Sequence, residues 1–139
     1  MVELGKRILS ILLVALLCAG VMACGEKQDP MEKIKDLDFS VIPEDKLPEE
    51  LLSAIEGKKE SPFKMTFQDQ GFLYICVGYG VQETAGYSIT VNALYETGNA
   101  IYIDTNLIGP GPEEKGKNTP TYPYIVVKTE NLDKSVVFD

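Results

Sequence analysis

The sequence contains no histidine and no tryptophan, and its only arginine is Arg7. A chain without histidine lacks the usual general base near neutral pH and the commonest metal ligand. Without a further arginine it also lacks the guanidinium group that binds phosphate or carboxylate through two parallel hydrogen bonds. Histidine-dependent catalysis is therefore excluded, and we predict a protein without catalytic residues, metal site or cofactor. Catalysis by two carboxylates, or by a serine and a lysine, stays open as an alternative, although no acidic pair has a recognisable spacing.

The first 23 residues have the layout of a secretory signal peptide, with a positive start, a short apolar region and a small residue before the cleavage site. Lys6 and Arg7 supply the charge, and residues 8–19 are almost entirely apolar. Ala23 is the small residue. The apolar run is short for a spanning helix, which needs roughly 20 apolar residues. We therefore expect residues 1–23 to be a signal peptide, with an uncleaved anchor as the alternative.

Val21-Met22-Ala23-Cys24 resembles the lipobox of bacterial lipoproteins, although Met22 is atypical of that motif. The resemblance implies cleavage before Cys24 and a lipid on its sulfur. A lipoprotein cysteine carries a diacylglycerol, and two acyl chains anchor a protein stably. We therefore expect a lipid-anchored protein at the extracytoplasmic face of the cell membrane. Residues 24–33 would form a flexible tether and residues 34–139 a single domain.

The net charge of the chain is −8. Loss of Lys6, Arg7 and Glu3 with the signal peptide removes a net +1 and leaves −9. An acidic domain does not favour DNA, RNA or anionic lipid headgroups as partners. The charge either keeps the domain soluble or attracts a basic partner surface.

Cys76 is the cysteine that processing would leave free, because Cys18 lies in the signal peptide and Cys24 would be acylated. No intramolecular disulfide can then form. Cys76 lies in the apolar run of residues 72–77, so we predict a small buried hydrophobe rather than a reactive thiol.

Residues 48–57 have the pattern of one short helix. A proline suits its first turn, acidic residues follow, and Gly57 can end it. Leu51, Leu52 and Ile55 form one apolar face. We expect this face to pack on a sheet, because an isolated helix of this length is unstable.

From residue 63 onward, apolar residues recur with the period of two that is typical of strands, and turn signals separate them. We predict strands at residues 37–41, 63–68, 72–79, 87–96, 101–107, 124–129 and 136–138. In residues 87–96, the period places Val91 and Tyr95 on one face and Leu94 on the other. We expect largely buried side chains at Phe63, Met65, Tyr74, Ile89, Val91, Ile101, Ile103 and Val126.

These elements predict a mainly β (α+β) domain with one short N-terminal helix. The strands would form an antiparallel sheet, folded either as a small sandwich or as a partly closed barrel. Two connections are too irregular for a sheet, namely the glycine-punctuated residues 80–86 and the proline-rich residues 109–122. Long connections in small domains are usually functional or disordered, and loops on a rigid scaffold commonly carry recognition. We expect a partner to bind here, provided that both segments lie at one end of the sheet.

The segments QETAGYSI at residues 82–89 and TYPYIVV at residues 121–127 resemble the PrcB C-terminal domain. The resemblance covers roughly Phe72 to Thr129. The sequence departs from the family pattern at Glu83, where the family often has proline, and at Ala85, where it often has glycine. Because position 85 is alanine, only the next residue, Gly86, needs a backbone conformation that is specific to glycine.

The resemblance implies a domain of lipoproteins or secreted proteins that is not itself catalytic. The family's namesake is a lipoprotein subunit that binds and stabilises a secreted protease. We therefore expect a non-catalytic module that binds a protein partner, with a secreted protease as the suspected partner. The candidate partner-binding residues are Thr84, Gly86, Tyr87, Tyr122 and Tyr124, because tyrosine offers large contact area with a polar tip.

Two alternatives remain open at this point. The tyrosines at 87 and 124 begin predicted strands and could instead close the ends of the sheet through their hydroxyl groups. Thr84-Ala85-Gly86-Tyr87-Ser88 is also faintly similar to a turn of chagasin-type cysteine-protease inhibitors. An envelope protease inhibitor, or a domain that binds a small ligand, is therefore the alternative function.

Overall fold

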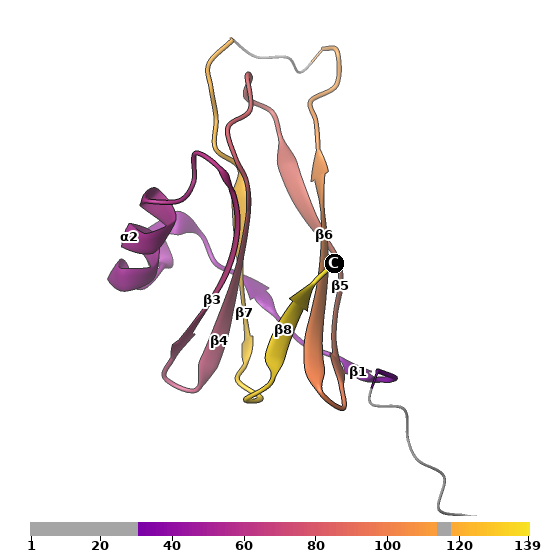
Figure 1. The fold of residues 1–139 in the computed structure, drawn as a ribbon. Coiled ribbons are helices and arrows are strands. Elements are labelled where there is room, and N and C mark those ends of the chain that lie inside the picture. The colour runs from indigo at the N-terminus through magenta and orange to yellow at the C-terminus, as the bar shows by residue number, and fades with distance from the viewer. Residues whose placement is uncertain (1–30, 114–117) are drawn as a thin grey trace, which may run out of the picture.

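The computed structural model describes residues 31–113 and 118–139. In these residues two four-stranded sheets pack face to face, and one helix covers the outer face of one sheet (Figure 1). The elements are β1 (Lys33–Asp36), β2 (Ser40–Val41), the 3-10 helix η1 (Glu44–Lys46), α2 (Glu49–Glu56), β3 (Pro62–Asp69), β4 (Phe72–Tyr79), β5 (Ser88–Thr97), β6 (Ala100–Ile108), β7 (Tyr124–Glu130) and β8 (Ser135–Phe138). The expected signal peptide, Cys24 and the expected tether up to residue 30 lie outside the described residues.

The predicted sandwich is confirmed, and the described strands form no closed barrel. Sheet A has the strand order β1-β5-β6-β8, and sheet B has the order β2-β7-β4-β3. The pairings are antiparallel except that of β6 with β8, which run parallel. The chain changes sheet between β4 and β5 and again between β6 and β7, so the two irregular connections both link one sheet to the other.

The first core lies between the sheets. It is built from inward-facing side chains of β4, β5, β6 and β7, which alternate along each strand with residues on the opposite face. Its buried members include Leu73, Ile75, Val77, Leu94, Ile101, Ile103, Ile125 and Val127. The central strands of both sheets therefore form a rigid support for the connections at their ends.

The second core lies between sheet B and α2. The predicted helix is confirmed, and Leu51 and Ile55 are both fully buried against the sheet. Cys76 is buried, as predicted, and it lies in this same layer. Burial raises the pKa of its thiol to about 12. Strand β4 is thus covered on both faces, which explains its continuous apolar run. In the described part of the chain, no helix is long and apolar enough to cross a membrane.

A β-bulge corrects the predicted alternation of β5. The register between β5 and β6 shifts by one residue between Val91 and Ala93, and one extra residue exchanges the two faces of the strand beyond it. Leu94 therefore faces the core, where it is 3% exposed. Tyr95 lies on the outer face of sheet A and stacks on Tyr102, with 5.2 Å between ring centroids. The prediction that Tyr95 shares a face with Val91 is wrong.

Only part of the predicted core is fully buried. Tyr74, Ile101, Ile103 and Val126 are at most 7% exposed. Phe63, Met65, Ile89 and Val91 are partly exposed. The first two lie on β3, an edge strand of sheet B, and the last two lie in a part of β5 that has no second neighbouring strand. Edge positions lose the cover that a further strand would provide.

The strand predicted at residues 37–41 is shorter than expected because the chain crosses between the sheets there. β1 pairs with β5 in sheet A, and β2 pairs with β7 in sheet B. Between them, Leu37 is buried in the first core, and the Thr129 hydroxyl donates a hydrogen bond of 2.8 Å to the Asp38 carbonyl oxygen. A segment that passes from one sheet to the other cannot remain in either ladder, so only Ser40 and Val41 form a strand.

Candidate functional site

The two irregular connections lie at the same end of the sandwich, which we call the loop end (Figure 1). Gln82 and Thr121 exchange two backbone hydrogen bonds, with N···O distances of 2.8 and 2.9 Å. The Thr121 hydroxyl donates a third bond, of 2.8 Å, to the carbonyl oxygen of Thr84. The condition for a shared surface is therefore met, because each connection supplies hydrogen-bond partners to the other.

Glycines set the path of the first connection. Gly86 has a φ of +95°, a value that side chains with a Cβ rarely adopt. The expected glycine-specific conformation at this position is confirmed. Gly80 has a φ of +75°, and a Cβ there would lie 2.8 Å from Cδ of Pro62. The two glycines turn the chain out of sheet B and into sheet A.

Thr84 and Tyr87 lie together in a groove at the loop end. The groove has a volume of about 490 Å³ and is lined by residues of both connections: Val81, Gln82, Glu83, Thr84, Tyr87, Gly109 and Pro110. Val81 is 53% exposed and supplies an apolar side chain, whereas Glu83 supplies a negative charge. A groove of this kind can bind a partner by contact and shape.

Tyr122 lines a second groove, of about 340 Å³, between the β2–η1 segment and the start of β7. Its ring centroid lies 5.3 Å from Nζ of Lys59, within the range of a cation–π contact. Lys59 forms an ion pair of 2.7 Å with Glu56, and the hydrogen bond between them raises the pKa of Lys59. The half-buried ring of Tyr122 is thus held by a lysine just beyond α2, and part of it remains accessible.

Tyr124 lines the same groove as Tyr122 but is also part of the layer beneath it. Its side chain packs against the second core, between sheet B and α2. Its hydroxyl oxygen is buried and has no hydrogen-bond partner among the described residues. Burial raises the pKa of this hydroxyl. The structure thus brings Thr84, Gly86 and Tyr87 together at one groove. It brings Tyr122 and Tyr124 together at the other groove, where Tyr124 also packs against the second core.

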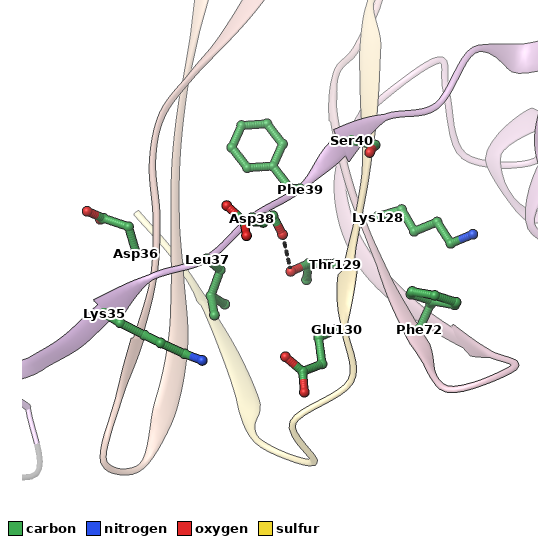
Figure 2. Close-up of a pocket in the computed structure, with 10 residues that line it drawn as sticks. All are labelled: Lys35, Asp36, Leu37, Asp38, Phe39, Ser40, Phe72, Lys128, Thr129 and Glu130. Atoms are coloured by element: carbon green, nitrogen blue, oxygen red, sulfur yellow. Dashed lines mark hydrogen bonds between the residues drawn. The ribbon is translucent and has the colours of Figure 1, made fainter.

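A further groove lies towards the opposite end of the sandwich, where the β1–β2 segment passes β4 and β7 (Figure 2). Its volume is about 500 Å³. Nζ of Lys128 lies 4.1 Å from the ring centroid of Phe72, which is 43% exposed. Figure 2 shows Lys35 and Glu130 extending into the space below the crossing segment. Sequence reasoning missed this groove, since its residues meet only through strand pairing and the crossing between sheets.

The described residues contain no cluster of three or more histidine, cysteine, aspartate or glutamate side chains that could hold a metal ion. The polar groups at the two grooves of the loop end include the Gln82 side-chain amide, the hydroxyls of Thr84 and Tyr87, the carboxylates of Glu44 and Glu83 and the ammonium group of Lys59. Their arrangement favours hydrogen bonding and apolar contact with another molecule.

Residues 73–130 match the family model described as PrcB C-terminal. The resemblance to the PrcB C-terminal family is confirmed. The matched region runs from β4 to β7 and therefore holds the two central strands of each sheet and both connections of the loop end. A search of curated proteins and a search of solved structures found no match to the chain.

Proposed function

We propose that the protein is a lipid-anchored, extracytoplasmic module that binds and stabilises a protein partner without catalysing a reaction. The observation that carries this proposal is the match of residues 73–130 to the PrcB C-terminal family, because the matched region includes both connections of the loop end. The family resemblance also supplies the class of partner, a secreted protease, for which this chain would be an accessory subunit.

The position of the N-terminal segment supports such a role. We call the end of the sandwich that carries the turns β3–β4, β5–β6 and β7–β8 the hairpin end. Met31 lies there, because its sulfur accepts a 3.4 Å hydrogen bond from the Tyr102 hydroxyl and a 3.9 Å hydrogen bond from the Asn99 side-chain amide. A lipid on Cys24 would therefore hold the hairpin end near the membrane. The loop end would then face away from the membrane, towards a partner outside the cell.

Partner capture tests the binding function. The mature chain, immobilised through its N-terminus, should retain one dominant protein from an envelope extract, and that protein should be a protease. Tyr122→Ala should weaken capture at least tenfold, because aromatic anchors carry much of the energy of an interface and tenfold corresponds to about 1.4 kcal/mol.

Tyr102→Ala is the matched control for this experiment. It removes an equal aromatic side chain, but from the outer face of sheet A near the hairpin end. Capture by this variant should equal that of the unchanged protein. Equal loss in both variants, or no dominant partner at all, contradicts binding at the loop end. The activity of the captured protease then separates a stabilising subunit from an inhibitor.

Replacement of the anchor residue tests the membrane attachment. Cys24→Ser removes the sulfur that would carry the lipid, so the protein should leave the membrane fraction or fail to mature. Fractionation followed by immunoblotting measures this, with Cys76→Ser as the control that keeps the proposed lipidation site. An unchanged membrane fraction for Cys24→Ser overturns the proposed anchor.

A further inference from the structure

One edge of sheet A is only half covered. β5 is ten residues long, but β1 pairs only with its last three residues, 95–97. The Leu37 N–H then donates a 2.9 Å bond to the Leu94 carbonyl oxygen, and the chain leaves for sheet B. In the described residues, no strand pairs with residues 88–93 on the side away from β6. The backbone groups on this side are free to pair with another chain.

Apolar side chains beside this edge are also incompletely covered. Ile89 and Val91 pack against the first core but stay partly exposed. Phe39, on the segment that crosses from β1 to β2, is 39% exposed, and Val41, on β2 itself, is 56% exposed. That segment joins the two sheets on the same side as the open edge of β5. An added strand could therefore cover apolar surface as well as satisfy backbone groups.

The full-length edge strand of sheet B, β3, is protected against pairing with another strand. β3 begins with a proline and carries Lys64, whose Nζ lies 5.8 Å from the ring centroid of Phe138 on the opposite sheet. An inward-pointing charge and a proline are common devices that prevent another strand from pairing with an edge. Residues 87–95 contain no charged residue and no proline. The open part of β5 lacks both of these devices, and the protective irregularity that it does contain is the bulge between Val91 and Ala93.

We propose that residues 88–93 of β5 bind an extended segment of the protein partner as an additional strand of sheet A. This inference rests on the proposed function and names the way in which the partner binds. Backbone hydrogen bonds would hold the segment, and its inward side chains would be apolar, because they would lie against Ile89, Val91 and Val41. The edge begins beside Tyr87, so the site continues the surface of the loop end.

A second copy of this chain fits the edge less well than a partner segment. Two identical strand edges related by a two-fold axis pair antiparallel. The hairpin ends of two such copies would then point in opposite directions. Chains anchored through their N-termini in one membrane need both hairpin ends on the same side. Dimer formation through β5 is therefore an outcome that would overturn the proposal.

A peptide library supplies a probe that does not depend on the natural partner. The full mature lipoprotein in detergent is used to select from displayed random ten-residue peptides, and the enriched peptides are synthesised. We expect sequences that alternate apolar and polar residues, and hydrogen–deuterium exchange should show that they protect amides in residues 88–93. No enriched peptide, protection confined to other residues, or a concentration-dependent dimer that protects these amides without peptide overturns the proposal.

Paired lysine variants sharpen this test. Val91→Lys places an inward-pointing charge on the open edge, as Lys64 does on β3, and should weaken peptide binding at least tenfold. Thr66→Lys makes the same change on the protected edge of sheet B and should leave binding unchanged. Exchange mapping on the unchanged protein decides the question if Val91→Lys does not fold. If peptides protect the amides of residues 88–93 but no protein partner is captured, the proposed function alone is refuted. If a partner is captured but these amides are not protected, this inference alone is refuted.

Discussion

The hairpin end and the loop end close the same two sheets in different ways. At the hairpin end, the turns are short and form bonds both within a turn and between turns. The Asn131 N–H donates a 3.2 Å bond to the Gly71 carbonyl oxygen, and Nζ of Lys134 donates a 2.8 Å bond to the Thr97 carbonyl oxygen. The Ala100 N–H donates a 3.1 Å bond to the hydroxyl of fully buried Thr97, and the Asp133 N–H donates a 3.1 Å bond to the Asn131 side chain. At the loop end, backbone groups of the first connection bond to residue 121 of the second.

This difference explains why recognition is expected at only one end. A short turn presents little surface, whereas two long connections that bond to each other present a broad surface on a rigid base. The loop end also depends on contacts between residues far apart in the sequence, such as those between Gln82 and Thr121. Substitutions can test whether the two ends differ in this way.

The largest expected effect comes from the core that both ends share. Ile103 is 1% exposed between the sheets, so Ile103→Ala should lower the free energy of unfolding by about 2–5 kcal/mol. Denaturant unfolding measures this loss, and hydrogen exchange should show lower protection at both ends. An unchanged unfolding curve contradicts the core described here, and loss of protection at one end alone contradicts the shared support.

A smaller loss is expected at the hairpin end. Thr97→Val keeps the shape of the side chain but removes the hydroxyl that accepts the bond from the Ala100 N–H. An unsatisfied buried donor costs about 1–3 kcal/mol. Thermal unfolding measures this cost, and partner capture should stay unchanged once the fraction of folded protein is corrected for. A loss of capture that remains after this correction contradicts the expectation that the partner binds only at the loop end.

A still smaller loss of stability is expected from the matching threonine-to-valine change at the loop end. Thr121→Val removes the hydroxyl bond to the Thr84 carbonyl oxygen but keeps both backbone bonds to Gln82. One partly buried bond contributes about 0.5–1.5 kcal/mol. We expect faster hydrogen exchange in residues 82–86 and weaker partner capture. Equal exchange rates in the two proteins contradict a coupling of the connections through this hydroxyl.

The smallest effect on stability is expected at Tyr122. Its main described contact is with Lys59, and a partly exposed cation–π pair contributes about 0.5–1 kcal/mol. Tyr122→Ala should therefore leave the melting temperature nearly unchanged while it weakens capture. A large fall in melting temperature, with capture reduced only in proportion to unfolded protein, shows a structural role instead. Lys59→Met provides the control that removes the cation and keeps the tyrosine.

Much of the architecture follows from short-range pattern. The helix at residues 49–56, the buried run of β4 and the hairpin turns each depend on residues a few positions apart. Gln70 and Gly71, with φ of +51° and +80°, form such a local turn between β3 and β4. Periodicity fails where one extra residue enters a strand, because the bulge near Asn92 exchanges the faces without any change in composition.

In the candidate site, too, some features follow from the sequence alone and others do not. Composition by itself determined that histidine-dependent chemistry is absent. The glycine-specific backbone conformation at position 86 was predicted from the motif around that residue. The family resemblance over residues 73–130 also came from sequence motifs. These properties depend on residue identity or on neighbours in the chain, so a linear sequence contains them.

Only the tertiary structure decided that the two connections meet at one end, since their contact joins Gln82 to Thr121. It also placed the Tyr124 side chain against the helix-side core, in the groove that Tyr124 shares with Tyr122. The open edge of β5 arises because β1 leaves sheet A after Asp36, which no local pattern records. Each of these features depends on which strands become neighbours, and that choice is made by burial of the two cores and not by the residues next to each position.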